Sequence, residues 1–410
     1  MPAAGAGASK KTSTARCACA PCSIAGTTSG AGKLPLRRRD PGDDRGRAGD
    51  PRAAGGRRGR RSARASLGAR RRCPREAAAR VAGVRPGQGG ASSVLVTGAS
   101  GLVGRQVVER LAADGVETLV ALDLREPAAE SRIDGVHYTA GDVRDPGLEK
   151  LLERHAVEAV VHLAAIVTPG PRSSRELEYG VDVVGTQQVV TACVRSGVRQ
   201  LVYTSSGAAY GYHADNPVPL CESDPLRGNE VFAYAWHKRL AEEALALQRR
   251  EHPQLAQLVF RVGTILGERV ASPITALFER PVVVGVAGCD SPFVLIWDED
   301  VAACIAKGIR EQSAGIYNLA GDGAIALPEI ARRLGKPFLP LPGALLAGVL
   351  GLLHALKLSA RGAEQADFLR YRPVLSNEAL KRDFGFAPRF TSEECFEHYR
   401  RLRFGATPAD

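Results

Sequence analysis

The chain has 410 residues, of which 44% are hydrophobic, and carries a formal net charge of +11. Residues 1–92 hold 21 Lys and Arg against 5 Asp and Glu, a net charge of +16, whereas residues 93–410 hold 34 against 39, a net charge of −5. The basic surplus belongs to the first segment alone, so the net charge gives no reason to interpret the whole chain as a nucleic-acid-binding protein.

Residues 1–92 are dominated by Ala, Gly, Arg, Pro and Ser and contain no aromatic residue. Such a composition buries too little apolar surface to offset the entropy of ordering, so we predict a disordered basic leader. An organelle transit peptide has a similar composition, and so does GC-rich DNA translated from a misassigned start. The run Arg57–Arg61 could contact phosphates without sequence preference, but a solvated charge run is the simpler interpretation.

Nine cysteines are spread over the chain. Cys17, Cys19, Cys22 and Cys73 lie in the leader, where their irregular spacing argues against a zinc site. The other five are scattered and odd in number, which favours reduced thiols in a reducing compartment and a cytoplasmic location. These five are Cys193, Cys221, Cys289, Cys304 and Cys395.

From Val94 onward, apolar strands alternate with amphipathic helices. This alternation predicts a parallel sheet with helices on both faces and right-handed crossovers, which is a doubly wound α/β fold. The predicted strands are Val94–Thr97, Thr118–Leu122, Val136–Tyr138, Ala159–Leu163, Gln200–Thr204 and Gln257–Arg261, and the main predicted helices are Leu102–Ala113, Leu177–Ser196 and Tyr234–Arg249.

A glycine-rich turn joins the first strand to the first helix. Gly98 permits a tight turn, Gly101 lets the backbone approach a pyrophosphate, and Gly104 allows the helix to pack closely on the strand. The unpaired N–H groups at the start of the helix then face the phosphates. We therefore predict a dinucleotide site that also includes the turn residues Ser100, Leu102 and Val103.

Asp123 ends the second strand, 19 residues after Gly104. A carboxylate at this place accepts hydrogen bonds from the adenosine ribose and repels a 2′-phosphate, so NAD is favoured over NADP. Arg125 is close enough in sequence to keep NADP as an alternative.

After residue 262 the alternation loosens. We predict a Rossmann domain at residues 93–262 and a smaller, mainly substrate-binding region at residues 263–410, over the carboxyl edge of the sheet. The apolar stretch Leu339–Leu353 is too short for a transmembrane segment, which takes about 20 residues. We predict that it forms a helix buried against the domain, with a weak membrane-surface contact near residues 343–356 as the alternative. Other elements predicted here are Val282–Val286, Asp300–Ile309, Ile316–Leu319 and Pro328–Leu334.

Tyr234 and Lys238 lie four residues apart, which places them on one face of a helix. A nearby cation lowers the pKa of a phenol by roughly 1–3 units and so suits Tyr to acid/base chemistry. Upstream, Thr204-Ser205-Ser206 follows an apolar strand, where a hydroxyl can hydrogen-bond a substrate carbonyl. Together these features predict a proton-transfer site.

With these motifs the chain resembles the extended short-chain dehydrogenases/reductases, or NAD-dependent epimerase/dehydratases, over about residues 93–405. The glycines at 98, 101 and 104 match the family's turn, and Ser206 stands in its catalytic slot, four residues before Tyr210. Tyr234 and Lys238 match its acid/base pair. Asp142 and Val143 resemble the adenine-contacting turn, and Leu163, Ala164 and Ala165 resemble the segment that lines the cofactor.

The resemblance implies that Tyr234 is the acid/base and that Ser206 orients the reacting oxygen. Lys238 would bind the nicotinamide ribose and lower the Tyr234 pKa. A hydride would pass between a small-molecule substrate and NAD, with NADP not excluded. The ketone leaves in dehydrogenases and stays in epimerases and dehydratases. We also expect a homodimer, and no nucleic acid bound to the folded domain.

Four positions depart from the pattern of sugar-nucleotide enzymes. Asp182 replaces a usual Asn, and Thr264 replaces an Asn that contacts the substrate diphosphate. Phe293 stands where an Arg on the diphosphate is usual, and Trp297 stands where His is common. Losing the Arg and the Asn removes strong phosphate donors.

Several hypotheses stay open. An epimerase or dehydratase acting on a (nucleotide) sugar is preferred to a hydroxysteroid-like or other apolar-alcohol dehydrogenase. A catalytically silent dinucleotide sensor would be a protein of another class, and a nucleic-acid role would be confined to the leader. We predict no metal site, because Asp298–Asp300 is better explained as a helix cap. His162 is interpreted as a structural residue, and His237 is expected to face solvent or pack near the cofactor.

Overall fold

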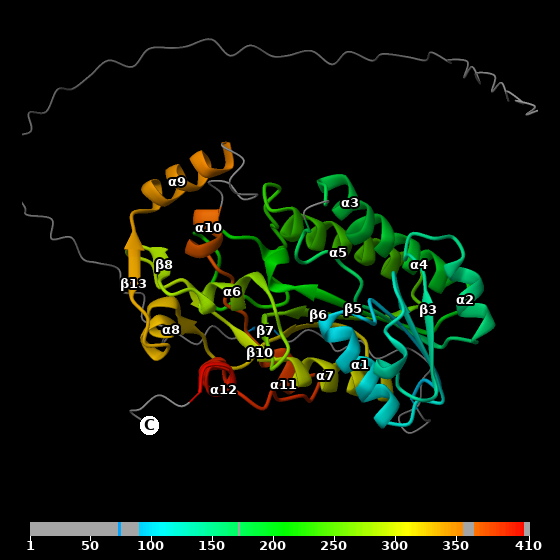
Figure 1. Cartoon of the computed structure of the whole chain (residues 1–410). Coiled ribbons are helices and arrows are strands. Elements are labelled where there is room, and N and C mark those ends of the chain that lie inside the picture. Colours follow the sequence, from blue (N-terminus) through cyan, green and yellow to red (C-terminus); the bar gives the residue numbers. More distant parts are fainter. Residues whose placement is uncertain (1–72, 75–89, 171–172, 356–364, 406–410) are drawn as a thin grey trace, which may run out of the picture. The chain divides into compact units, whose positions relative to one another are not determined.

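The computed structural model has a central β-sheet flanked by helices (Figure 1). Its seven strands are parallel and lie in the order β11-β6-β5-β4-β1-β2-β3. The structure describes residues 73–74, 90–170, 173–355 and 365–405. Nearly all of the predicted leader, with Cys17, Cys19, Cys22 and the Arg57–Arg61 run, lies outside these residues. The strands are β1 (Ser93–Thr97), β2 (Thr118–Asp123), β3 (Val136–Ala140), β4 (Ala159–His162), β5 (Gln200–Ser206), β6 (Ala256–Val262) and β11 (Gly315–Leu319).

The predicted doubly wound parallel sheet is confirmed. Every residue of β1 and β6 is buried, as expected for strands that are covered on both faces. The strand order reverses between β1 and β4, which pair in parallel with Thr97 opposite His162. Ligands of open α/β sheets bind at the carboxyl ends of the strands at such a switch point, and the predicted glycine turn leaves β1 there.

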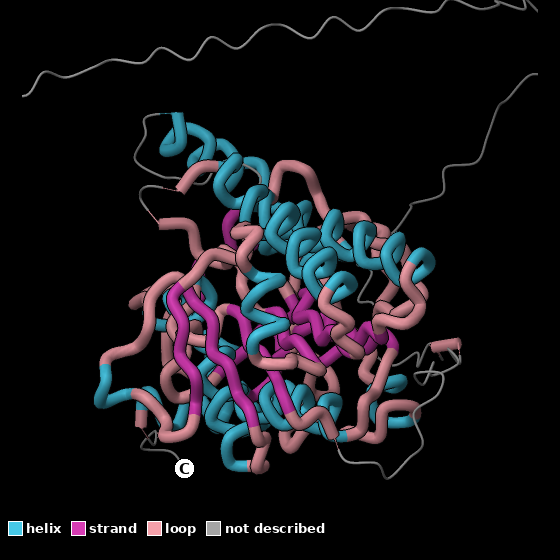
Figure 2. Tube along the Cα trace, turned by 90° about the vertical axis from the view of Figure 1, so that its right-hand side faces the viewer, coloured by secondary structure: helices cyan, strands magenta, loops and turns pink. Residues whose placement is uncertain are grey.

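Helices cover both faces of the sheet (Figure 2). On one face, Val107 and Leu111 of α1 (Leu102–Ala113) share a core with Ile305 of α7 (Asp298–Arg310). The other face packs against α2 (Leu148–Arg154), α4 (Thr186–Arg195) and α5 (Ala233–Glu251), whose Leu152, Val190 and Leu245 belong to a second core.

The predicted helix Leu177–Ser196 is interrupted. It consists of α3 (Arg175–Tyr179), a π-helical turn (Gly180–Gly185) and α4. The regular 3.6-residue periodicity carries no signal for such a widened turn, which is frequently found at functional sites. Asp182 is buried within it.

The region beyond β6 adds three strand pairs beside the sheet. They are β7 (Thr264–Leu266) with β10 (Leu295–Trp297), β8 (Val283–Val286) with β13 (Phe338–Leu341), and β9 (Pro292–Phe293) with β12 (Ile325–Ala326). Phe278, Phe293 and Phe396 centre their core. All of the described residues belong to one compact unit, and the domain division at residue 262 stays a prediction. The helices here are α6 (Pro273–Glu279), α8 (Leu327–Arg333), α10 (Gln365–Arg370), α11 (Glu378–Arg382) and α12 (Ser392–Phe404).

The apolar helix α9 (Gly343–Ala355) is less buried than predicted. Leu346 is buried, but Leu345, Val349 and Leu352 are 53%, 45% and 61% exposed. A helix that is apolar all round can bury only the stripe that its neighbours cover. Among the described residues, no helix is both long and apolar enough to cross a membrane. A surface contact near residues 343–356 stays a prediction.

Cys221 forms a disulfide with Cys73 of the predicted leader, so the expectation of a reduced thiol is wrong for Cys221. Their sequence separation of 148 residues hid the pairing, because spacing alone does not reveal which cysteines meet. Cys193, Cys289, Cys304 and Cys395 are free thiols.

A chain that begins at Ser92 is expected to fold and to bind dinucleotide as the full chain does. The sheet begins at Ser93, and Ser92 still anchors β1 by donating from its backbone N–H to Glu158 at 2.8 Å. Thermal unfolding and dinucleotide titration test this expectation. Full-length Cys73→Ser is the matched control, because it removes the disulfide and keeps the leader. A truncated chain that unfolds while Cys73→Ser stays folded would contradict the expectation.

Candidate active site

The glycine turn leaves no room for side chains at two positions. A Cβ on Gly98, which has a φ of +69°, would lie 2.7 Å from the backbone nitrogen of Ala164, and one on Gly104 would lie 2.1 Å from the Gly98 carbonyl oxygen. Gly101 is the N-cap of α1, and no side chain caps this helix. The exposed Gly101 and Leu102 therefore present the helix start, with its backbone N–H groups, to a ligand. Val103 follows, partly buried, in the same turn.

Asp123 holds the glycine turn in place. Its carboxylate accepts from the backbone N–H groups of Ser100 at 2.9 Å and Leu124 at 2.7 Å. An ionised carboxylate has about four acceptor positions, so capacity remains for ribose hydroxyls. Arg125 is exposed, and its backbone carbonyl accepts from the Ser100 hydroxyl at 3.2 Å.

The segment after β4 lies against the glycine turn. The backbone N–H of Leu163 donates to the Thr97 carbonyl at 3.2 Å, and that of Ala164 donates to the Thr97 hydroxyl at 3.4 Å. Ala165 follows and is partly buried. The tight glycine turn, the uncapped start of α1 and the carboxylate at the end of β2 therefore lie at the same edge of the sheet. Together these features fit a dinucleotide.

The predicted adenine-contacting turn is also ordered by a charge pair. Arg144 donates to both carboxylate oxygens of Asp142, the shortest contact being 2.6 Å, and this hydrogen bonding lowers the Asp142 pKa. Val143 is buried, and a Cβ on Gly185 would lie 2.8 Å from its Cγ2. The π-helical turn therefore packs directly on this part of the predicted cofactor site.

The structure brings Ser206, Tyr234 and Lys238 together. Ser206 is the last residue of β5, and its hydroxyl accepts from the Ala208 backbone N–H at 3.1 Å. Tyr234 lies in the first turn of α5. The Lys238 ammonium donates to the Thr204 carbonyl at 2.8 Å and lies 5.9 Å from the centre of the Tyr234 ring.

The pKa of Tyr234 moves in the opposite direction to the sequence-based prediction. Burial raises it to about 12, and a hydrogen bond with Ser206 opposes this increase. The expected lowering by Lys238 is not found: desolvation of the phenol dominates its pKa, and the opposing effect comes from Ser206. Burial also lowers the pKa of Lys238 to about 8, against the opposing effect of Asp182 and Glu242.

Asp182 and His237 form a buried pair that the sequence analysis missed. The Asp182 carboxylate accepts from the Ile166 backbone N–H at 2.8 Å, and its other oxygen lies 3.1 Å from the His237 Nδ1. Both side chains are at most 2% exposed, so the prediction that His237 faces solvent is wrong, and packing near the cofactor stays a prediction. The available signal was the combination of an acid at the usual Asn position with a His beside Lys238.

His162 has the structural role that was predicted. Its ring nitrogens lie 2.7 Å from the Thr97 hydroxyl and 3.1 Å from the Thr186 hydroxyl, and the side chain is fully buried. Burial lowers its pKa to about 3, so the ring is neutral at physiological pH.

A buried hydrogen-bond network next to the predicted catalytic residues holds Tyr210. Its hydroxyl lies 2.8 Å from the Arg261 Nη1 and 2.9 Å from the Asn318 Oδ1. Arg261 also pairs with Glu242 at 2.8 Å, and Glu242 accepts from the Ser205 hydroxyl at 2.5 Å. Tyr210 is completely buried and burial raises its pKa, so this phenol is not available as a substitute acid/base.

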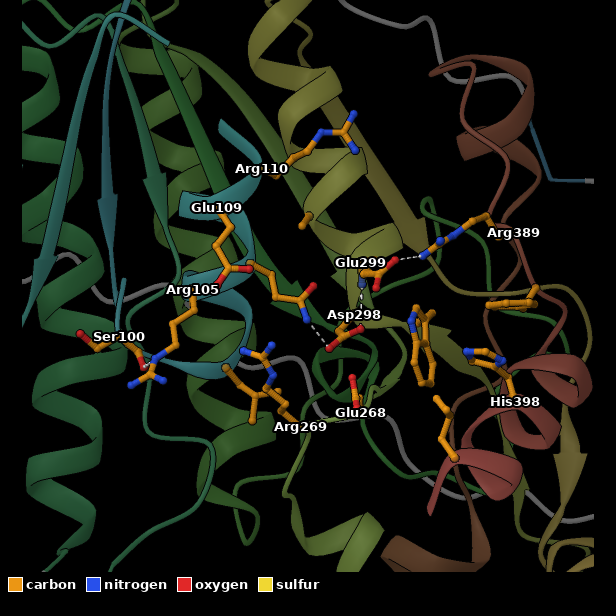
Figure 3. A pocket seen from close by; sticks show the side chains of 16 residues that line it. Ser100, Arg105, Glu109, Arg110, Glu268, Arg269, Asp298, Glu299, Arg389 and His398 are labelled. Carbon is orange, nitrogen blue, oxygen red and sulfur yellow. Dashed lines mark hydrogen bonds and ion pairs between the residues drawn. The ribbon is translucent and has the colours of Figure 1, made fainter. Parts of the chain in front are cut away.

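A cavity of about 740 Å³ begins at the glycine turn and extends towards α7 and α12 (Figure 3). Ser206, Tyr234 and Lys238 are not among the residues that line it. On its wall, Asp298 accepts from the Gln106 amide at 2.6 Å, and burial raises the Asp298 pKa to about 6. The cavity therefore adjoins the glycine turn but is not lined by the predicted catalytic residues Ser206, Tyr234 and Lys238.

The acidic run at Asp298–Asp300 forms the first turn of α7, whose N-cap is Trp297. The acidic run therefore begins one position after the cap. Acidic residues in the first turn still stabilise the helix through its dipole. Asp300 pairs with Arg389 at 2.7 Å. No group of three or more His, Cys, Asp or Glu that could hold a metal occurs within the described part of the chain.

Comparison with known proteins places this chain in a family. A model of the NAD dependent epimerase/dehydratase family matches residues 94–320. The uncharacterized protein Rv0501 of Mycobacterium tuberculosis is 26% identical over 320 residues, which are 77% of this chain and 85% of that protein. A UDP-glucose 4-epimerase of Erwinia amylovora is 29% identical over 184 residues, which are 43% of this chain and 54% of that protein.

Solved structures share the fold. The UDP-glucose 4-epimerase of Thermus thermophilus in complex with NAD has a TM-score of 0.58 at 24% identity, over 75% of this chain and 99% of that chain. A short-chain dehydrogenase/reductase superfamily protein from Agrobacterium tumefaciens with bound NAD has a TM-score of 0.59 at 23% identity, over 76% and 97%. Since the family model covers more than half of the chain, this protein belongs to the NAD-dependent epimerase/dehydratase family and is an NAD-dependent enzyme.

Proposed function

We propose that this enzyme moves a hydride between NAD and a secondary alcohol or ketone carbon of a (nucleotide) sugar, with Tyr234 as the acid/base. The observation that carries the proposal is the convergence of Ser206, Tyr234 and Lys238 at the carboxyl end of β5, on the same edge of the sheet as the glycine turn. Ligands of open α/β sheets bind at this edge.

Bound NAD would accept the hydride and return it, and the residues of the chain would do the rest. The Ser206 hydroxyl would orient the substrate oxygen and stabilise the charge that develops on it. Tyr234 would take the hydroxyl proton on oxidation and give it back on reduction. Because burial raises its pKa to about 12, Tyr234 is protonated at pH 7. Tyr234 therefore already carries the proton that it would donate when the substrate ketone is reduced.

A nucleotide sugar is the proposed substrate because relatives with this chemistry share both sequence and fold. The relative from Erwinia amylovora and the structural neighbour from Thermus thermophilus are UDP-glucose 4-epimerases. An apolar-alcohol dehydrogenase stays the second candidate, because Phe293 is buried at a position where a phosphate-binding Arg is usual. Incubating the enzyme with NAD and UDP-glucose, and resolving the C4 epimers by NMR, tests the first candidate against a panel of apolar secondary alcohols.

Asp123→Ala is expected to weaken NAD binding by about tenfold to a hundredfold and to relax the preference for NAD over NADP. A hydrogen bond to a charged group contributes about 1.5–3 kcal/mol, and the substitution also releases the Ser100 N–H from its acceptor. Fluorescence titration with both cofactors measures the effect, and Arg125→Ala is the control that should keep the NAD affinity. Equal or better binding of NADP by the unmodified protein would contradict the prediction.

Assembly and location are proposed on other grounds. The family resemblance supports a homodimer, and the four free thiols support a reducing, cytoplasmic location. The disulfide between Cys73 and Cys221 argues in the other direction. Mass spectrometry of the purified protein without reductant would measure how much of this pair is oxidised.

A further inference from the structure

One guanidinium contacts both positions at which the usual phosphate donors are missing. The Arg372 Nη2 donates to the Thr264 hydroxyl at 3.0 Å. The guanidinium carbon lies 3.9 Å from the centre of the Phe293 ring and 4.8 Å from that of Phe368. Thr264 and Phe293 therefore fix the position of a cation that comes from a distant part of the chain.

Arg372 is left with buried donors that bind nothing. Its Nε and Nη1 are inaccessible to solvent and have no hydrogen-bond partner. Among the described residues, no carboxylate forms an ion pair with it. Burial lowers its pKa to about 10, so the side chain is still charged at neutral pH. Unpaired donors on a buried cation are unfavourable and therefore call for an explanation.

The surroundings connect Arg372 to the catalytic group. Phe368 packs against Tyr212, with ring centres 5.0 Å apart, and both belong to the cluster that includes Tyr234. Further along the same segment, a Cβ on Gly207 would lie 3.1 Å from the Leu375 side chain. Gly207 directly follows Ser206, so this segment borders the end of β5 where chemistry is proposed.

We propose that Arg372 binds an oxyanion of the substrate, a diphosphate or a carboxylate, and thereby determines specificity at the site of the proposed hydride transfer. The proposal rests on that proposed function and names its substrate class. A guanidinium held by Thr264 and by ring stacking presents its remaining N–H groups in a fixed plane, which suits oxyanions. A neutral alcohol would leave the buried charge uncompensated. Nε and Nη1 are inaccessible to solvent in this structure, so neighbouring groups must move aside when the anion binds.

Calorimetric titration of the full chain, saturated with NAD, tests the proposal with UDP and with glucuronate as probes. Arg372→Met keeps much of the side-chain length and removes the charge, whereas Arg372→Lys keeps the charge and loses the planar fork. We expect Arg372→Met to bind one of the two probes at least tenfold more weakly and to keep the NAD affinity, with Arg372→Lys in between. The affected probe identifies the oxyanion as a diphosphate or a carboxylate.

Thermal unfolding separates this role from a structural one. Arg372→Met removes unpaired buried donors, so we expect its melting temperature to stay at or above that of the unmodified protein. Unchanged affinity for both probes, no binding of either probe by the unmodified protein, or loss of stability together with NAD binding would each overturn the proposal. These titrations need no turnover, so a failure of the proposed hydride transfer would show separately, in the activity assays.

Discussion

Tyr234→Phe is expected to abolish turnover and to leave NAD binding nearly unchanged. The substitution removes the transferable proton, and positioned proton transfer contributes typically ~10²–10⁴-fold to a rate. The ring still packs beside Phe232 and Tyr212, so folding should survive. Steady-state kinetics on a proven substrate, together with NAD titration, measures both effects.

Two further variants serve as controls for this result. Lys238→Ala should damage both rate and NAD affinity, because its ammonium is proposed to bind the cofactor ribose and to assist the phenol. Ser206→Ala should lower chiefly the rate constant, since its bond strengthens as charge develops on the substrate oxygen. Full activity of Tyr234→Phe would contradict the proposal that Tyr234 is the acid/base. Tyr210 would not explain such activity, because its hydroxyl is held by Arg261 and Asn318 in the buried network.

Glu242→Ala is expected to reduce the free energy of unfolding by about 3–5 kcal/mol, the usual range for removing one partner of a buried ion pair. Arg261 and Glu242 are 5% and 4% exposed and 2.8 Å apart. The substitution leaves the Arg261 charge without its carboxylate in the interior, and it also removes the acceptor of the Ser205 hydroxyl. Urea unfolding followed by circular dichroism measures the change.

The neighbouring Glu243 offers a matched control on the same helix. It pairs with Arg239 at 2.7 Å, but Glu243 is 50% exposed and Arg239 is 32% exposed. Exposed pairs contribute roughly 0–1 kcal/mol, so Glu243→Ala should unfold almost as the unmodified protein does. If Glu242→Ala lost no more unfolding free energy than Glu243→Ala, the buried network would not stabilise the fold.

The sequence predicted the fold best for elements that are buried on both faces. Strands β1 and β6 are continuous apolar runs because helices cover both faces of the sheet, and α1 has the predicted bounds Leu102–Ala113. The prediction failed where packing against other elements determines the local structure. Apolar composition could not show which stripe of α9 stays exposed, and helical periodicity could not show the π-helical turn at Gly180–Gly185.

The same distinction holds for the site. Short motifs predicted the glycine turn, and they predicted Tyr234 and Lys238, because these residues are neighbours in sequence. The buried pair of Asp182 with His237 and the contact of Arg372 with Thr264 join residues 55 and 108 positions apart. No local pattern reports such contacts, and they require the three-dimensional arrangement.

Isotope transfer tests the central claim of direct hydride transfer. The enzyme would be incubated in ordinary water with NAD and with its substrate carrying deuterium at the reacting carbon. Mass spectrometry would then locate the label. The account predicts that the deuterium is kept, either on the nicotinamide or on the returned carbon of the product, and that Tyr234→Phe transfers almost none of it. Release of the deuterium to solvent during turnover by the unmodified enzyme would contradict direct hydride transfer.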